Sequence, residues 1–138
     1  MELLIIDAQG GGLGRQLVTM VKRAMPQLTV IAVGTNATAT GAMLKAGADQ
    51  AATGENAVIV ASRRADIIAG PIGIVIADAM LGEITPQMAT AVGQSNAVRV
   101  LIPMSRCATL VAGVETGSTG ALLEDAVKKI CTAAEATA

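Results

Sequence analysis

Apolar and polar residues follow one another along the chain in a pattern that predicts strands alternating with helices. Leu3 to Ile6 is a continuous apolar run, typical of a strand covered on both faces, and residues 28–33 form a second such run. The segment between them has helical spacing of its apolar residues, at Leu13, Leu17, Val18, Val21 and Met25. Pro26 ends that helix, so the chain opens with strand, glycine loop, helix and strand.

The same order continues after the second strand. A helix is expected to begin at one of three capping residues and to end near Gly47; the candidates are Thr35, Asn36 and Thr38. Residues Asp49–Ala52 predict a short third strand, and Glu55–Arg64 a further helix.

The middle of the chain contains its most ambiguous apolar run. Asp66–Ala69 predicts a fourth strand, closed by the turn at Gly70 and Pro71. The run IGIVIADAML, residues 72–81, fits either a buried helix or a strand. We expect a helix, because residues 78–83 continue the pattern naturally.

The last part repeats the alternation. Thr85 and Pro86 predict a helix start, with the hydroxyl at the cap and proline in the first turn. Ala97–Ile102 predicts a fifth strand, Thr109–Val114 a possible sixth, and Thr119–Ala133 a closing helix. Buried strands alternating with helices predict an α/β fold, a three-layer α-β-α sandwich. We expect one Rossmann-like domain over residues 1–138, with a mainly parallel sheet of five or six strands.

Composition adds an expectation about assembly. The chain is 52% apolar and 15% charged, with a mean hydropathy of +0.58 and neither aromatic residues nor histidine. With so few charged residues, part of the surface of a small globular protein must be apolar. We therefore expect a homo-oligomer with an apolar interface. The net charge is −1, without a basic patch or aromatic platforms, and therefore argues against nucleic acid as a partner.

Membrane, metal and targeting signals are weak. The longest apolar stretch, Ile67–Ala77, is interrupted by Gly-Pro and is too short to span a bilayer, and the first residues lack the charged start of a secretory signal. We therefore expect no membrane partner and a cytoplasmic location. Cys107 and Cys131 have no metal-type spacing and no histidine nearby, so no metal site is expected.

The stretch AQGGGLGRQLV, residues 8–18, is the strongest candidate for chemistry. A bare backbone at the start of a helix lets pyrophosphate approach, and the helix amides and dipole stabilise an anion. The candidate residues of this loop are Gln9, Gly10, Gly11, Gly12, Leu13 and Gly14. The alternative is that the glycines only permit tight packing of the helix on the strand. We expect a bulky residue at Gly11 to abolish binding while leaving the fold mostly intact.

A dinucleotide would extend from this loop along the sheet edge. Ligands of parallel sheets lie outside the carboxyl ends of the strands, where the second strand ends in Thr35 and Asn36, which can hydrogen-bond a ribose or phosphate. The turn over Gly70, Pro71 and Ile72 would lie beside the middle of an extended dinucleotide. NAD is the expected cofactor, with NADP or another nucleotide as alternatives.

The loop resembles the glycine fingerprint of Rossmann folds. GGGLGRQLV is similar to a run of the extended short-chain dehydrogenases, although the first fingerprint position is Gln9 or Ala8 instead of glycine. The chain has no tyrosine, so the Tyr-Lys mechanism of those enzymes is excluded.

Nearly the whole chain also resembles a small family of uncharacterised bacterial proteins that carry a domain of unknown function. The runs DAQGGGLGRQLV, VGTNATATGAMLKAGAD, TGENAVIV, GPIGIVIADAMLGEITP and LIPMSRC carry this resemblance. It implies a Rossmann-like fold and no assigned activity.

Acid-base chemistry would fall to carboxylates or a thiol, so Asp78, Glu83 and Cys107 are the catalytic candidates. An unpaired carboxylate in an apolar helix is costly, so Asp78 is expected to have a partner such as Arg99 or Arg106. Whether the protein is an enzyme stays open. The other function considered is a non-enzymatic structural or ligand-sensing oligomer without nucleotide, assembled through the apolar segment Ile72–Leu81.

Overall fold

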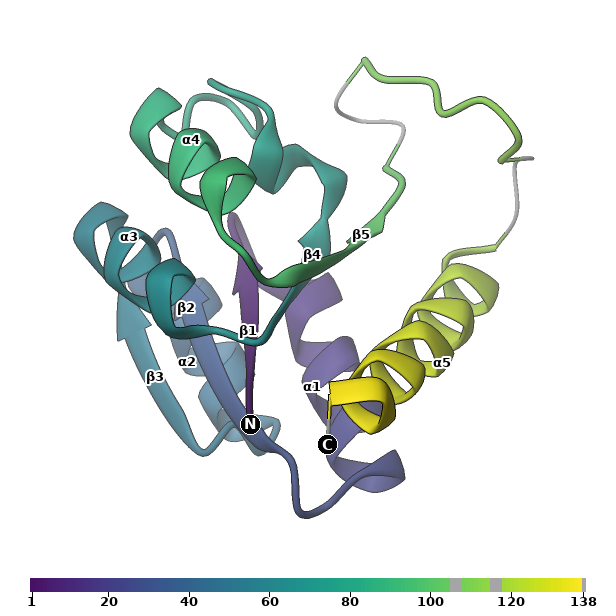
Figure 1. Cartoon of the computed structure of the whole chain (residues 1–138). Helices are drawn as coiled ribbons and strands as arrows, with labels where there is room; N and C mark the ends of the chain where they lie inside the picture. Colours follow the sequence, from purple (N-terminus) through teal and green to yellow (C-terminus); the bar gives the residue numbers. More distant parts are fainter. Residues whose placement is uncertain (105–107, 115–117, 138) are drawn as a thin grey trace.

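A five-stranded, all-parallel sheet forms the centre of the protein, with helices on both faces (Figure 1). The structure is a computed structural model that describes residues 1–104, 108–114 and 118–137. Its strands are β1 (Glu2–Asp7), β2 (Thr29–Gly34), β3 (Gln50–Thr53), β4 (Ile67–Pro71) and β5 (Val98–Ile102). The strand order is β3-β2-β1-β4-β5, so the order reverses between β1 and β4. The expected three-layer α-β-α sandwich with a Rossmann-like sheet is confirmed by the strand order and by the helices on both faces (Figure 1).

The helices follow the strands closely in sequence. They are α1 (Gly12–Ala24), α2 (Ala37–Lys45), α3 (Glu55–Arg64), the short 3₁₀ helix η1 (Ile72–Val75), α4 (Pro86–Gln94) and α5 (Thr119–Thr137). Asn36 is the N-cap of α2 and Thr85 that of α4, each accepting a backbone N–H. Two of the expected caps are therefore confirmed.

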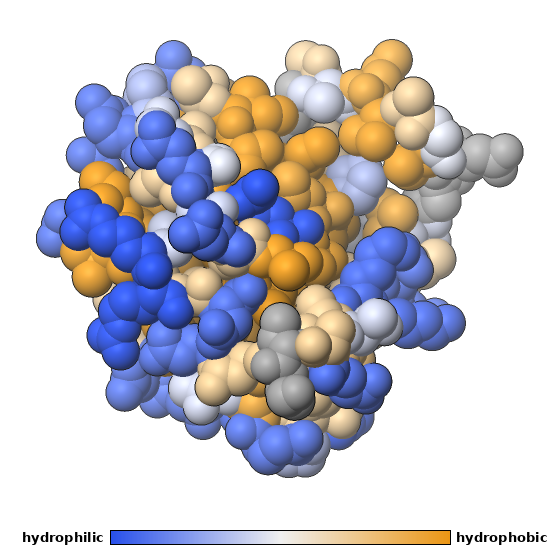
Figure 2. Space-filling model, in the orientation of Figure 1, coloured by the Kyte–Doolittle hydropathy of each residue, from blue (hydrophilic) through white to orange (hydrophobic). Residues whose placement is uncertain are grey.

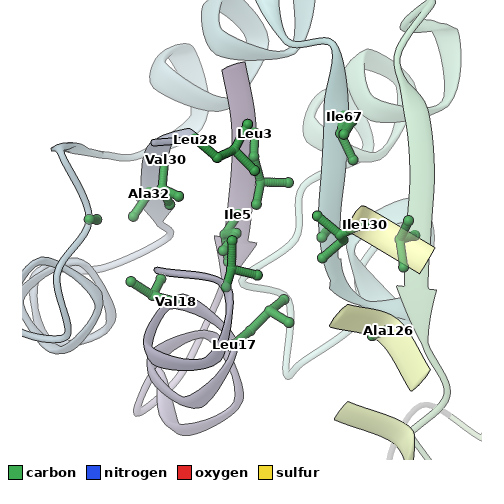
Figure 3. Close-up of a cluster of buried hydrophobic side chains, with 14 of the residues drawn as sticks. Leu3, Ile5, Leu17, Val18, Leu28, Val30, Ala32, Ile67, Ala126 and Ile130 are labelled. Carbon is green, nitrogen blue, oxygen red and sulfur yellow. The ribbon is translucent and has the colours of Figure 1, made fainter. Parts of the chain in front are cut away.

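Alternate residues of each strand supply two separate cores. Leu3, Ile5 and Ile67 point to the face covered by α1 and α5, and Figure 3 shows them beside Leu17 and Ile130. Leu4, Ile6 and Ile68 belong to the other core, under α3 and α4. Because both of their faces are buried, β1, β2 and β4 are mostly apolar, which is why the sequence marked them clearly, whereas the edge strand β3 is mostly exposed.

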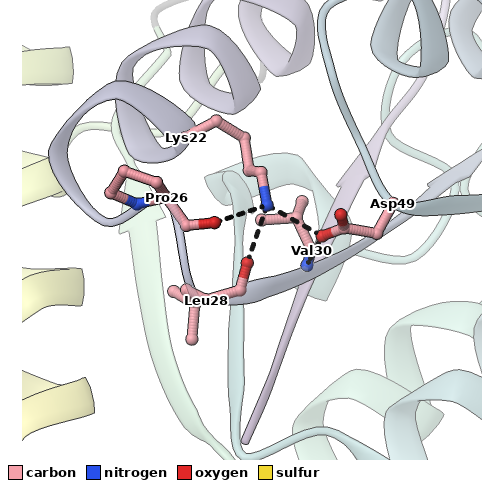
Figure 4. Close-up of polar contacts among 5 residues, drawn as sticks. All are labelled: Lys22, Pro26, Leu28, Val30 and Asp49. Atoms are coloured by element: carbon pink, nitrogen blue, oxygen red, sulfur yellow. Dashed lines mark hydrogen bonds and ion pairs between the residues drawn. The ribbon is translucent and has the colours of Figure 1, made fainter.

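A lysine joins the turn after α1 to the sheet. Lys22 Nζ donates to the carbonyl oxygens of Pro26 and Leu28, at 3.2 and 3.0 Å, and to Asp49 Oδ2 at 3.0 Å (Figure 4). Asp49 Oδ2 also accepts the Val30 N–H at 2.8 Å, and these contacts hold the pKa of Asp49 below its usual range. This network holds α1 against the starts of β2 and β3.

Two expected elements are absent. Residues 72–83 do not form a helix: η1 ends at Val75, and turns follow up to Ile84. In these turns Asp78, Met80 and Leu81 have positive φ angles of 66°, 55° and 58°, which no α-helix contains. No strand covers residues 109–114, all of which the structure describes. The apolar run over residues 72–81 did not indicate that some of its residues have a left-handed backbone conformation.

The surface is unevenly divided between polar and apolar residues. In Figure 2, apolar residues gather over the centre and upper part of the face shown, and polar residues dominate its left and lower margins. Within the described residues, no helix is both long and apolar enough to cross a membrane.

Candidate functional site

A cavity of about 630 Å³ lies above the glycine loop. It is at the carboxyl ends of β1 and β4, where the strand order reverses, which is the usual ligand position in open α/β sheets. Its lining residues are Asp7, Ala8, Gln9, Gly10, Gly11, Gly12, Leu13, Gln16, Pro71, Met80, Leu81, Met104 and Thr119. The volume lies within the usual range of small-molecule pockets.

The four glycines of the loop divide into two pairs. Gly11 and Gly14 are buried; a Cβ on Gly11 would lie 2.7 Å from Ala39 Cα, and one on Gly14 would lie 2.6 Å from Met43 Sδ. Gly11 also has a φ of +71°, the left-handed region that favours glycine. For Gly11 and Gly14, the need for glycine is therefore explained by close packing of the loop and α1 against their neighbours.

Gly10 and Gly12 differ in both respects. Both are exposed, and a Cβ added to either one would meet nothing within 4 Å. Neither has a positive φ, so neither packing nor backbone conformation requires glycine here. A bare backbone at these two positions keeps open the space in front of the loop.

This division corrects the expectation about Gly11. A bulky residue there would collide with the backbone of α2 at Ala39, so it would disturb the fold as well as the site. The positions suited to blocking the cavity without that damage are Gly10 and Gly12.

Asp7 supports the loop from below. It is the last residue of β1 and is only 4% exposed; its Oδ1 accepts the Ala8 N–H at 2.8 Å and its Oδ2 the Gly14 N–H at 2.7 Å. Burial raises the pKa of Asp7, the two backbone hydrogen bonds lower it, and the nearby Glu83 raises it further. The net effect is a pKa above the usual aspartate value, because burial outweighs the hydrogen bonds.

Two amides at the start of α1 stay available. Gly12 and Leu13 occupy the first two helical positions, and their N–H groups have no acceptor among the described residues. The Gly14 N–H, one residue further, is taken by Asp7. Free amides at a helix start, beside a cavity, favour the negative end of a ligand.

Glu83 lies in the segment after β4 and η1, and it binds the loops that follow β1 and β2. Its Oε1 accepts the Gln9 N–H at 3.0 Å, the Thr35 hydroxyl at 2.6 Å and the Asn36 Nδ2 at 2.7 Å. The Thr35 hydroxyl is the main cause that holds the pKa of Glu83 below its usual range. At neutral pH Glu83 is therefore an ionised hydrogen-bond acceptor that holds these loops together, and not a proton donor.

The structure separates the predicted ligand residues. Gln9, Gly10, Gly11, Gly12, Leu13 and Pro71 line the cavity. Gly14, Thr35, Asn36, Gly70 and Ile72 do not. Gly70 has a packing role instead, since a Cβ there would lie 2.4 Å from the Ile6 carbonyl oxygen.

Two of the three catalytic candidates, Asp78 and Glu83, are not among the residues that line the cavity. Asp78 is an exposed turn residue, so the partner that an apolar helix would have required is unnecessary. Arg99 instead donates to the carbonyl oxygens of Ser95, Val92 and Ala97 at the end of α4. Cys107 and Arg106 lie outside the described residues. No group of three metal-ligating side chains occurs in the part of the chain that the structure describes.

Sequence reasoning missed several lining residues. Met80 and Leu81 were assigned to a helix, although their left-handed turn places them on the cavity wall, and Leu81 is 96% exposed. Asp7 directly follows the apolar run of the first strand and lies three residues before Gly10, so its position at the strand end was a usable signal. Met104 belongs to the loop after β5, which was expected at this edge.

The chain is similar to one solved structure described as a dodecameric FMN-dependent UbiX-like decarboxylase from Escherichia coli O157:H7. The two are 18% identical, the match covers 97% of this chain and 76% of the other, and the TM-score is 0.46. No curated protein matches the chain.

The expectation of NAD is corrected. The similar solved structure is described as that of an FMN-dependent protein. In addition, Thr35 and Asn36, which were expected to contact the adenosine ribose, donate to Glu83 instead.

One comparison covers nearly the entire chain. Residues 2–135 match the family described as "Domain of unknown function (DUF3842)". The glycine loop, both walls of the cavity and the Glu83 contacts all lie within the matched range. The chain belongs to this DUF3842 family.

Proposed function

We propose that this protein binds a phosphorylated small molecule of the nucleotide class in the cavity above the glycine loop. The observation that carries the proposal is the open space at Gly10 and Gly12, where the fold itself has no need of glycine. A ligand that approaches the backbone closely supplies the reason for both residues.

The phosphate would lie on the loop, against the N–H groups of Gly12 and Leu13. These are the amides at the start of α1 without an acceptor among the described residues, and the helix dipole adds to their attraction for an anion. No lysine or arginine is among the lining residues that the structure describes, so backbone donors would carry the recognition there.

The rest of the ligand would lie between apolar side chains. Met80 and Leu81 stand on one wall of the cavity, and Leu13, Pro71 and Met104 complete its apolar lining. Thioether side chains adapt to flat aromatic surfaces, and the chain has no aromatic residue to stack on a ring. A phosphorylated ligand with a planar base or flavin ring fits this division into polar and apolar parts.

The test is a calorimetric titration of the full chain with FMN, AMP and inorganic phosphate. We expect binding of at least one of them, and loss of about tenfold or more in affinity in Gly10→Val and in Gly12→Val, because the new side chains would stand between ligand and amides. Gly41→Val is the control, since Gly41 of α2 is also exposed with nothing within 4 Å of an added Cβ.

Two results would overturn the proposal: no binding of any probe, or unchanged binding in both loop variants. The first, together with a stable multimer, would favour the alternative of an assembly subunit without nucleotide. Most apolar side chains of the segment expected to form that assembly surface are at least partly buried, and Ala77 and Leu81 are its exposed ones. The homo-oligomer stays a prediction, which sedimentation of the same sample would test.

A further inference from the structure

The turn between η1 and α4 reaches across the end of β1 to the loop after β2. Glu83, at the end of this turn, accepts hydrogen bonds from Gln9, which follows β1, and from Thr35 and Asn36, which follow β2. In Rossmann-like sheets this is the side on which the second half of a dinucleotide lies, with its ribose near the end of the second strand.

The hydrogen-bond donors of Thr35 and Asn36 on that side are already in use. Asn36 Nδ2 donates to Glu83 Oε1 and, at 2.9 Å, to the Gln9 carbonyl oxygen, while Asn36 Oδ1 accepts the Ala39 N–H at the cap of α2. The Thr35 hydroxyl donates to Glu83, and the Thr35 N–H donates to the Asp7 carbonyl oxygen. Neither side chain has a hydrogen-bond donor left for a ribose.

The cavity is limited in the same direction. Its lining runs from the glycine loop toward Pro71, Met80, Met104 and Thr119, on the β4 and β5 side. Thr35, Asn36 and Glu83 are not among its lining residues. The open space therefore begins at the glycine loop and extends away from β2.

We infer that Glu83 restricts the ligand to a single nucleotide unit, by holding the turn over the place that the second unit of a dinucleotide would need. This inference rests on the proposed function, because it concerns the size of the ligand in the same cavity. Glu83 acts here as a specificity residue through its position and touches no reacting atom.

The experiment compares FMN with FAD, which consists of the same flavin mononucleotide joined to AMP. We expect the full chain to bind FMN at least about tenfold tighter than FAD. In Glu83→Ala the ratio of the FAD to the FMN dissociation constant should fall toward one, because FAD gains the space that the turn occupied, whereas any loosening of the cavity wall weakens both ligands alike. A purely structural role of Glu83 would weaken both ligands together and leave the ratio unchanged.

Thr35→Val is a milder second variant, which loses the shortest hydrogen bond to Glu83 and keeps the Asn36 cap of α2. It should move the ratio in the same direction by a smaller factor. Circular dichroism of both variants checks that each is folded before titration.

The possible outcomes are separable. Equal binding of FMN and FAD by the unaltered chain would overturn the inference and leave the proposed function standing. An unchanged ratio in both variants would also overturn it. Binding of neither flavin nor AMP would overturn the proposed function, and the inference with it.

Discussion

The carboxylate of Asp7 accepts the N–H of Gly14 at 2.7 Å, so the third residue of α1 is capped by a strand residue. The N-cap itself, Gly11, has no side chain to do so. A buried carboxylate therefore lies directly below the two amides that face the cavity.

The first prediction concerns the closeness of that contact. Gly14→Ala should lower the free energy of unfolding by about 1–3 kcal/mol, because the new methyl group would lie 2.6 Å from Met43 Sδ and 2.9 Å from Asp7 Cβ. Urea denaturation measures this change. Gly41→Ala, in an open position of α2, should instead stabilise the protein by up to about 1 kcal/mol, and an equal effect of the two substitutions would contradict the packing role.

The second prediction concerns pH. The pKa of folded Asp7 lies above its ordinary value of 3.8, so its favourable contribution is complete below that value and is lost as the pH rises through the folded pKa. The Asp7→Asn variant lacks this titration. The unfolding free energy of the unaltered protein minus that of the variant should therefore fall as the pH rises from about 4 through the folded pKa. A difference that grows over this interval would show that the hydrogen bonds outweigh burial.

The same substitution tests the electrostatics of the cavity. An anion on the Gly12 and Leu13 amides would lie close to the Asp7 carboxylate, and like charges repel strongly where water is excluded. Asp7→Asn should therefore tighten the binding of FMN or inorganic phosphate several-fold at neutral pH. Weaker binding by a folded variant would mean that the carboxylate helps to hold the ligand.

A further prediction concerns Thr35 and Glu83. Thr35→Val should cost about 1–2 kcal/mol at neutral pH, because it removes a hydrogen bond to an ionised carboxylate. The pKa of folded Glu83 lies below its ordinary value of 4.5, so the stability that it contributes is present above that value and is lost on acidification. The cost should therefore shrink as the pH falls. Thr90→Val, on the exposed side of α4, is the control in urea denaturation.

The last prediction compares two lysines. Lys22→Met should lower the free energy of unfolding by about 1–2 kcal/mol, since two carbonyl oxygens and Asp49 lose a donor. Lys129→Met removes only a pair with Asp125 four residues earlier on an exposed face of α5, and should change stability by less than about 0.5 kcal/mol. Equal losses in thermal denaturation would show that the Lys22 network is no stronger than a surface pair.

The sequence allowed the prediction of much of the sheet and its helices, because the central strands β1, β2 and β4 are buried on both faces and mostly apolar. The helix Glu55–Arg64 was predicted with its observed bounds. The run from residue 72 was interpreted wrongly, since apolar character does not show that Asp78, Met80 and Leu81 have left-handed backbone conformations. Handedness of single residues depends on the surrounding contacts, which sequence periodicity does not describe.

The candidate site, like the fold, was predicted in part from the sequence. The glycine content of the loop after β1 predicted a ligand site there, and the loop does line a cavity. Which glycines are needed for packing depends on Ala39 and Met43 of a distant helix, and the partner of Thr35 and Asn36 lies more than forty residues away. Such long-range contacts have no local signal in a single sequence.

The left-handed turn that carries Met80 and Leu81 is held at both ends by hydrogen bonds, from Asp78 N–H to the Ile84 carbonyl oxygen and from three donors to Glu83. Backbone conformations of this kind are costly for bulky residues and persist only where their surroundings enforce them. The wall of the cavity is consequently preorganised. An arriving molecule would spend little of its binding energy on ordering the protein, and its association rate should approach that of a rigid receptor.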